Sequence, residues 1–168
     1  MQKENTNIRT AQTNDLQRLN EIFNVAREKM RNAGNPSQWP ENYPSLEVLQ
    51  RDMELQQSYL VERNNKIVAT FVLAKGIDPT YLHIEQGNWL NNDLPYATLH
   101  RVASDYGVQN IGRTVIEWCK KQSNNLRADT HRDNLVMQHL LLTSGFKYCG
   151  IIHVANGTER LAYQWLKA

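Results

Sequence analysis

Apolar residues first recur at helical spacing after a short extended segment near the start of the chain. One predicted helical face carries six of them three or four residues apart: Leu16, Leu19, Ile22, Phe23, Ala26 and Met30. Thr13 is a candidate N-cap, and Gly34-Asn35-Pro36 is typical of a helix end. The pattern predicts a polar, frayed tail over residues 1–6, a strand over 8–10 and a helix from about residue 13.

The next apolar positions predict a second helix and then a hairpin. Ser45 can cap a helix that carries Leu46, Leu49 and Met53. Residues 59–62 and 67–73 are rich in β-branched and aromatic residues, which is typical of strands, and four polar residues between them suit a tight turn. Residues 74–95 show little periodicity, with one short extended piece expected over 81–85.

The second half alternates strands with helices and closes on a hairpin. Strands are predicted over 95–104 and 126–131, with helices over 110–121 and from an Asn134 N-cap to Gly145. Two final strands, 147–154 and 159–166, flank Asn156-Gly157, a strong signal for a two-residue turn. At 168 residues the chain fits one α/β domain, with a mixed, mostly antiparallel sheet flanked by about four helices.

Composition favours a small-molecule partner. The net charge is +2 without a block of like charge, so neither nucleic acid nor a membrane surface is indicated as a partner. No apolar signal core or membrane span is present, which makes the cytoplasm the expected location. Cys119 and Cys149 lie far apart and are expected to be reduced core residues.

The junction between the strand at 95–104 and the following helix has the properties of a phosphate site. Free backbone amides and the positive end of a helix dipole meet there, and Gly107 and Gly112 permit close approach of a ligand to the backbone. A pyrophosphate is the natural ligand for such a junction. Taken alone, an ordinary strand-to-helix turn explains the two glycines equally well.

A second segment makes the pattern specific. The strand 126–131 leads into the helix capped by Asn134, which closes with Gly145-Phe146 and re-enters as a strand through Gly150. Over residues 95–155 this arrangement resembles the GNAT superfamily of N-acetyltransferases, and further segments resemble a bacterial branch of it. Those segments are Gln38-Trp39-Pro40, Tyr43-Pro44, His100-Arg101, Asp129-Thr130-His131 and Gly150-Ile151-Ile152.

The resemblance implies a GNAT-like sheet with a central splay and an acyltransferase that moves groups other than aminoacyl groups. It implies acetyl-CoA as co-substrate, no metal, and direct attack by an amine in a ternary complex. The pantetheine arm would pair with Val102, Ala103 and Ser104, and the diphosphate would rest on a run of backbone amides: Gly107, Val108, Gln109, Asn110, Ile111, Gly112 and Arg113. Asn134, Met137 and Leu141 would line the arm from the other side.

Three positions, two in the loop and one in the helix capped by Asn134, depart from the pattern of the superfamily. The usual loop is Arg/Gln-x-x-Gly-x-Gly/Ala, whereas Gly107 holds its first position here and Asn110 that of its first glycine. Asparagine tolerates left-handed backbone geometry, so the amide cradle can survive this change. Leu141 replaces the tyrosine that protonates the leaving thiolate in many members, and Tyr148 is a substitute candidate.

Amine attack needs a general base, for which Glu85 and His100 are the candidates. A hydrogen-bonded structural role is an equally open interpretation of a strand histidine. Trp39, Tyr43 and Tyr81, with Trp89, are candidate walls of the pocket for the amine, although core packing also explains aromatic residues.

Other functions stay open at this point. An altered loop and a missing acid also fit a non-catalytic acyl-CoA sensor with a GNAT fold. Asp129, His131 and Asp133 would suit a metal hydrolase only if the strand continued past the expected turn. Cys119 gives little support to an acyl-enzyme. Many acetyltransferases of this size are homodimers, so the resemblance leaves a homodimer possible, although no apolar stripe specifies an interface. Amino acids, polyamines, antibiotics and peptide N-termini are all open as amine substrates.

Overall fold

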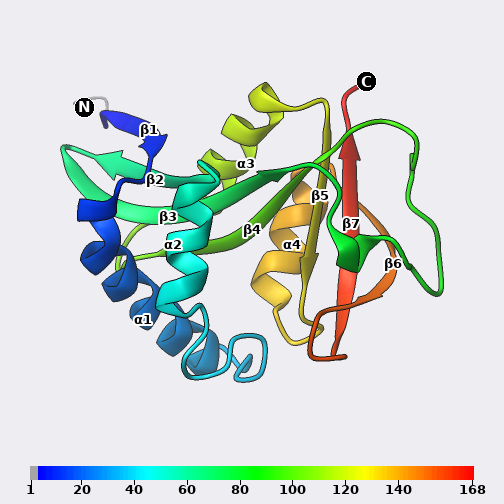
Figure 1. Cartoon of the computed structure of the whole chain (residues 1–168), viewed down its shortest axis with the longest axis horizontal. Coiled ribbons are helices and arrows are strands. Elements are labelled where there is room, and N and C mark those ends of the chain that lie inside the picture. Colours follow the sequence, from blue (N-terminus) through cyan, green and yellow to red (C-terminus); the bar gives the residue numbers. More distant parts are fainter. Residues whose placement is uncertain (1–3) are drawn as a thin grey trace.

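The computed structural model describes residues 4–168, which form seven strands and four α-helices (Figure 1). The strands are β1 (Thr6–Thr10), β2 (Ser58–Arg63), β3 (Lys66–Lys75), β4 (Ala97–Ser104), β5 (Asn125–Thr130), β6 (Lys147–His153) and β7 (Glu159–Leu166). The helices are α1 (Leu16–Asn32), α2 (Leu46–Glu54), α3 (Ile111–Gln122) and α4 (Leu135–Thr143). Short 3-10 turns cover Thr13–Asp15 and Pro79–Tyr81.

All seven strands form a single sheet in the order β1-β2-β3-β4-β5-β7-β6. Each neighbouring pair is antiparallel except β4 and β5, which are parallel because α3 connects them as a crossover. The predicted mixed, mostly antiparallel sheet with four helices is therefore confirmed.

Helices cover both faces of the sheet, because successive strand residues point to opposite sides. Leu60 packs with α1 and α2 on one face, whereas its neighbour Val61 packs with α3 and α4 on the other. On the β5–β7 half, the long connection over residues 76–96 takes the place of α1 and α2, burying Tyr81 and Trp89 against β6 and β7. Among residues 4–168, no helix combines the length and apolar character needed to cross a bilayer.

The middle of the sheet opens because β4 and β5 pair over only three residues each, ending at Leu99 and Ala128 (Figure 1). Immediately beyond, β4 has a bulge: Arg101 and Val102 lie opposite the single residue Phe71 of β3. Arg101 has a φ of 49°, so the backbone turns sharply there. The splay that the resemblance implies is present at this point.

Local signals account for most element boundaries. Ser45 Oγ accepts a hydrogen bond from the Val48 amide at 3.3 Å, and Asn134 Oδ1 accepts one from the Met137 amide at 3.1 Å, so both predicted N-caps are confirmed. Thr13 is not a cap; the Gln12 amide donates to the Asp15 carboxylate at 2.8 Å instead.

Two boundaries differ from the sequence-based expectation. The first strand begins at Thr6, inside the expected frayed tail, because it pairs with β2 from Arg63 onward; residues 1–3 lie outside the described residues. The last hairpin turns over three residues rather than two, since the Val154 amide donates to the Thr158 carbonyl at 3.0 Å and Gly157 takes a φ of 82°.

The connection over 76–96 is held by a buried cation. The guanidinium of Arg127, on β5, lies 4.0 Å from the Trp89 ring centroid and 3.9 Å from that of Tyr96. It also donates to the Asn91 carbonyl at 2.9 Å. The expected extended piece over 81–85 reduces to one bridge, in which Glu85 and Ile151 exchange two backbone hydrogen bonds of 2.8 Å.

Candidate active site

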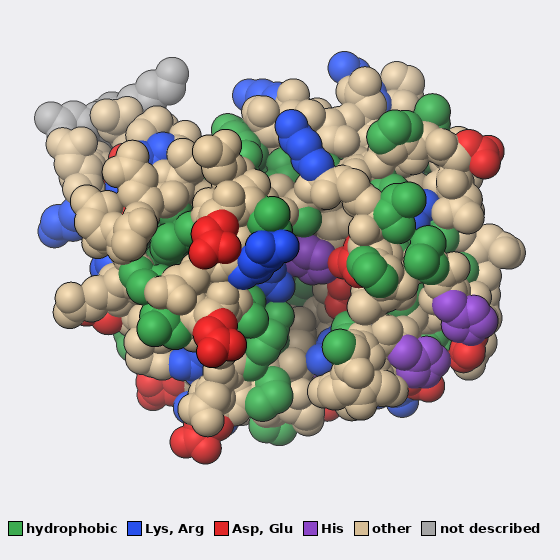
Figure 2. Space-filling view, viewed as in Figure 1, with side chains coloured by type: hydrophobic (Ala, Val, Ile, Leu, Met, Phe, Trp, Pro, Cys, Tyr) green, Lys and Arg blue, Asp and Glu red, His purple; other side chains and the backbone are tan. Residues whose placement is uncertain are grey.

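A cleft of about 700 Å³ lies where β4 and β5 separate. Its walls come from β4, β5, the loop between α1 and α2, the start of the 76–96 connection, the first turns of α4 and the β6–β7 turn. Figure 2 shows this face of the molecule hollowed near its centre, with acidic, basic and histidine side chains around the hollow. The cleft is therefore bordered by both halves of the sheet.

His100 and Asp129 follow directly after the last paired residues of β4 and β5, so they flank the opening of the splay. Both side chains line the cleft. Tyr81 links them from the 76–96 connection: its hydroxyl donates to Asp129 Oδ2 at 2.6 Å, and its ring lies 6.2 Å from the His100 ring. Burial, and then the adjacent Asp129 charge, raises the pKa of Tyr81, which keeps this hydroxyl protonated.

Asp78 orients the imidazole of His100. Its Oδ2 lies 3.1 Å from His100 Nε2, while Oδ1 accepts from the amide and hydroxyl of Thr80 at 2.9 and 2.8 Å. Burial raises the pKa of Asp78, but the hydrogen bonds from His100 and Thr80 outweigh it and lower that pKa to about 2. An ionised carboxylate only accepts, so Nε2 donates to Asp78, and in a neutral imidazole Nδ1 is then the nitrogen with the lone pair.

The bulge of β4 is fixed by a buried ion pair. Arg101 donates to both carboxylate oxygens of Asp52, on α2, at 2.6 and 2.9 Å, and to the Tyr43 hydroxyl at 3.1 Å. Trp39 packs between Tyr43 and Phe23 of α1, with ring centroids 6.3 and 5.7 Å away. These contacts attach the loop between α1 and α2 to the strand that borders the splay.

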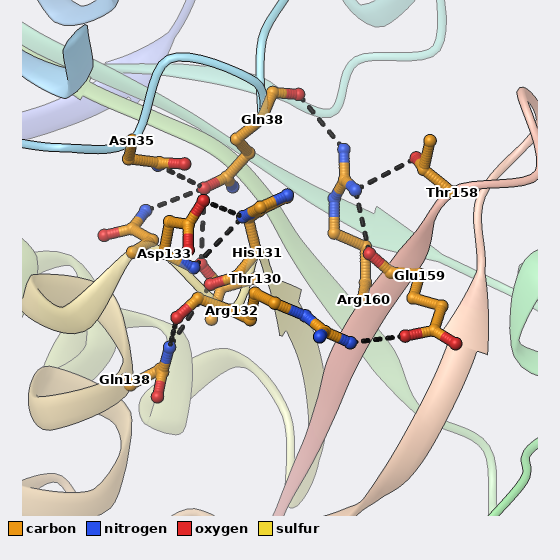
Figure 3. Close-up of polar contacts among 11 residues, drawn as sticks. Asn35, Gln38, Thr130, His131, Arg132, Asp133, Gln138, Thr158, Glu159 and Arg160 are labelled. Carbon is orange, nitrogen blue, oxygen red and sulfur yellow. Dashed lines mark hydrogen bonds and ion pairs between the residues drawn. The ribbon is translucent and has the colours of Figure 1, made fainter.

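The same loop crosses to the other half of the sheet through Gln38 (Figure 3). Gln38 Oε1 accepts from the side-chain amides of Asn35 and Asn134, each at 2.9 Å. The Gln38 carbonyl accepts from Arg160 Nη2, on β7, at 3.1 Å. Asn134 thus caps α4 and also links α4 to the loop between α1 and α2.

The start of α3 presents a row of free donors. Within residues 4–168, the backbone amides of residues 107–113 have no hydrogen-bond partner. Asn110 has a φ of 60°, the left-handed geometry that its place in the loop requires. Arg63 steadies this loop by donating to the Gln109 carbonyl at 2.7 Å. Unpaired amides at the positive end of a helix dipole suit an anionic group.

The residues predicted to bind the cofactor fall into distinct positions. Val102, Asn134 and Met137 line the cleft. Ala103 and Leu141 are buried in the core, and the Ser104 carbonyl and hydroxyl accept from Lys29 Nζ of α1 at 2.9 and 2.8 Å. The remaining seven predicted residues form the loop before α3 and its first turn, outside the lining of this cleft. They are Gly107, Val108, Gln109, Asn110, Ile111, Gly112 and Arg113.

The candidate catalytic and pocket residues are only partly brought together. His100, Trp39 and Tyr43 line the cleft, and Tyr81 lies behind Asp129 in the core. Glu85 does not reach the cleft lining: it pairs with β6, and its carboxylate lies 3.0 Å from His83 Nε2. Tyr148 is also outside this lining, exposed on β6.

Sequence reasoning missed Asp78 and Arg160, and it considered Asp129 as a structural residue or a metal ligand. Asp78 was part of an Asp-Pro turn signal, and its contact with His100 joins positions 22 residues apart in sequence. Arg160 carried no motif. The available signal for Arg160 was a charged residue within a predicted strand, since arginine is seldom buried without a partner.

Neither a metal site nor a reactive thiol appears in the described part of the chain. No group of three or more potential ligands is found within residues 4–168. His131 Nδ1 accepts from the Asp133 amide at 3.0 Å, as the chain turns away from Asp129. Cys119 is buried, and burial raises the pKa of its thiol to about 12.

No known protein-family model matches the chain, and no curated protein matches it. Several solved structures match it. A GNAT-family acetyltransferase of Streptococcus agalactiae is 26% identical, with a TM-score of 0.88 over 97% of this chain and 96% of that chain. The chain has the GNAT fold.

More distant structures share the GNAT fold. A GNAT-family acetyltransferase of Listeria monocytogenes is 17% identical, with a TM-score of 0.71 over 96% of this chain and 94% of that one. A ribosomal-protein-alanine N-acetyltransferase of Brucella melitensis is 20% identical, with a TM-score of 0.62 over 95% and 99%. The resemblance predicted from the sequence is confirmed, and the GNAT fold supports acetyl transfer in general.

Proposed function

We propose that this chain is an N-acetyltransferase that moves an acetyl group from acetyl-CoA to an amine by direct attack in a ternary complex. The observation that carries the proposal is the pair of side chains at the splay. His100, oriented by Asp78, and Asp129, bonded by Tyr81, flank one opening where a cleft passes between β4 and β5. A thioester lying in that opening would have both groups beside it.

The open edge of β4 suits the cofactor arm. Within residues 4–168, no strand pairs with residues 100–104 on the β5 side, so their backbone groups facing the gap, apart from the Ser104 carbonyl bonded by Lys29, can bind an extended, amide-containing chain. The free amides at the start of α3 would hold the diphosphate. Acetyl-CoA supplies the activated acyl group when bound.

His100 would act as the general base through Nδ1. As the amine nitrogen bonds to the acyl carbon and the bond from carbon to sulfur breaks, Nδ1 would take the amine proton, directly or through one water. Asp78 would hold the resulting imidazolium in place. Leu141 is apolar and buried, so the thiolate would take its proton from water or from His100.

A binding measurement tests the cofactor assignment. Acetyl-CoA and CoA are titrated calorimetrically into the wild type and into Gln109→Glu. Gln109 is exposed at the start of α3, where a carboxylate stabilises the helix but repels a diphosphate on the same amides. A change at Gly112 is less suitable, because an added Cβ would lie 2.3 Å from Leu140 Cδ2 and disturb helix packing.

Gln122→Glu, an exposed change of equal charge at the other end of α3, is the control. We expect CoA affinity to fall about tenfold or more in Gln109→Glu and to stay near wild type in Gln122→Glu. Absence of CoA binding in the wild type would refute the proposal. Tight binding without turnover on any amine would favour the acyl-CoA sensor instead.

A further inference from the structure

Arg160 is a buried cation that the mechanism above does not use. Arg160 is 7% exposed, and it lines the cleft from β7. Its guanidinium donates three hydrogen bonds, all to neutral oxygens: the Gln38 and Glu159 carbonyls at 3.1 and 2.9 Å, and Thr158 Oγ1 at 3.1 Å (Figure 3). The side chain is therefore fixed in direction before any ligand arrives.

The guanidinium has donors to spare. It has five N–H groups, of which three are engaged, so Nε–H and one Nη2–H are without an acceptor within residues 4–168. In the same part of the chain, Arg160 makes no ion pair within 4.0 Å, whereas its neighbour Arg132 pairs with Glu159. Burial lowers the pKa of Arg160, which is the cost of a desolvated charge without a bonded counter-ion.

Nearby charges point to an anionic group on the ligand. Asp129, on the adjacent strand β5, is the acidic group that most opposes the lowering of the Arg160 pKa by burial, and its carboxylate is already hydrogen-bonded by Tyr81. Arg160 in turn lowers the pKa of His131, although burial is the larger cause of that shift. The cleft therefore presents an anionic group and a cationic group side by side, without a direct ion pair between them.

We propose that the amine substrate also carries a carboxylate, which Arg160 binds through its free Nε–H and Nη2–H. This inference rests on the proposed function and specifies its substrate class as amino acids and other amines with a carboxylate. A carboxylate is a charged acceptor for these donors, and hydrogen bonds between a guanidinium and a carboxylate are stronger than those to neutral oxygens. Asp129 receives the ammonium end, which loses one proton to water to become the attacking amine, and His100 takes the second proton as the bond to the acyl carbon forms.

The phosphates of CoA are a less suitable partner for Arg160. The free amides of residues 107–113 already form an anion site outside the lining of this cleft. Arg160 instead contacts the loop between α1 and α2 and the β6–β7 turn, both of which line the cleft. A substitution at Arg160 should therefore weaken binding of the amine substrate and leave binding of the nucleotide of CoA unchanged.

The first test uses the wild type with matched amines. L-Phenylalanine, L-lysine and L-histidine are compared with their amides, and with phenethylamine, cadaverine and histamine, by release of free CoA thiol. We expect kcat/KM for at least one amino acid to exceed those of its amide and its carboxylate-free amine by about 100-fold. Equal or higher rates for the carboxylate-free partners of every pair would overturn the proposal.

The second test changes the cation. Arg160→Gln should raise KM for the preferred amino acid about 100-fold while KM for acetyl-CoA stays within about twofold, and Arg160→Lys should lose about tenfold because it keeps charge without the planar fork. Arg132→Gln, exposed and already paired with Glu159, is the matched control. A rise in KM for acetyl-CoA alone would assign Arg160 to the cofactor and overturn the inference.

The two proposals fail in different ways. Calorimetry of acetyl-CoA with Arg160→Gln reports the cofactor site directly, and urea unfolding shows whether the variant is folded. If acetyl-CoA does not bind the wild type, the proposed function fails. If acetyl-CoA binds and amines are acetylated without a preference for carboxylates, only the substrate class is wrong.

Discussion

At the scale of single residues, the proposed chemistry depends on His100 and on the carboxylate that holds it. Asp78 contacts one imidazole nitrogen, and His100 lines the cleft. In the proposed mechanism, Asp78 therefore orients the base as much as the position of His100 on β4 does.

Replacing His100 by Gln removes the proton acceptor while keeping a hydrogen-bonding side chain of similar size. We expect kcat/KM to fall by about 10²-fold or more, which is typical for loss of a general base. The pH dependence on the acidic side of the rate profile should be lost with it.

Glu85→Gln is the informative comparison, since Glu85 was the other candidate base and its carboxylate contacts His83 at the edge of the sheet. We expect less than a twofold change in kcat/KM. A large loss with Glu85→Gln and none with His100→Gln would reverse the assignment.

The carboxylate of Asp78 should also contribute to stability in a pH-dependent way. Its pKa is about 2 in the folded protein against an ordinary value of 3.8. A lowered pKa means that ionised Asp78 stabilises the fold above the ordinary value, and that this contribution is lost as pH falls from about 4 to about 2.

Urea unfolding of the wild type and Asp78→Asn measures this contribution. The difference in unfolding free energy should be about 2 kcal/mol at pH 6 and should shrink steadily below about pH 4. A difference that is independent of pH would show that the carboxylate is not held as described.

The sequence predicted some of these residues and not others for a physical reason. His100, Trp39 and Tyr43 have side chains whose chemistry is informative wherever they lie, and all three line the cleft. Asp78 and Arg160 acquire their roles only from contacts with distant segments, which no local pattern encodes.

At the scale of elements, the bulge of β4 is held by the buried pair of Arg101 and Asp52. Their side chains are 15% and 5% exposed, so the charges compensate each other away from water. Breaking such a pair leaves one buried charge uncompensated.

We expect Asp52→Asn to lower the unfolding free energy by about 3 kcal/mol. The acetylation rate should fall as well, because Arg101 and the adjacent Val102 would no longer be fixed at the splay. Denaturant unfolding and steady-state kinetics measure the two effects.

Glu54→Gln serves as the control, since Glu54 and Arg51 form an exposed pair at 3.8 Å on the same helix. Glu54→Gln should lower the unfolding free energy by no more than about 0.5 kcal/mol. An equally small effect for Asp52→Asn would mean that the bulge does not depend on this pair.

The helices and strands could be predicted from the spacing of apolar residues, but the structure of the connection over residues 76–96 could not. Its apolar residues Tyr81 and Trp89 pack singly against β6 and β7, and Arg127 stacks on Trp89 and on Tyr96. Such packing has no repeat along the chain. The splay likewise came only from the resemblance, because a loss of strand pairing leaves no mark on hydrophobic spacing.

At the scale of the whole molecule, the cleft separates a half built on β1–β4 from a half built on β5–β7. The two halves meet through three paired residues on each of β4 and β5, through the core that they share beneath α3, and through Gln38, which contacts Asn134 and Arg160. A ligand that fills the splay would contact both halves at once, so its binding should stabilise both.

Acetyl-CoA at about 100 times its dissociation constant should raise the unfolding free energy by about 2.7 kcal/mol, because it binds only the native state. Amide hydrogen exchange should slow on both sides of the cleft, over residues 102–104 of β4 and over residues 135–137 of α4, since a bound arm restrains both borders. Gln109→Glu, at the same concentration, should show a smaller gain at both borders. Slower exchange confined to α3 and its loop would mean that the nucleotide binds without the arm entering the splay, and the mechanism drawn from His100 and Asp129 would then have no substrate beside it.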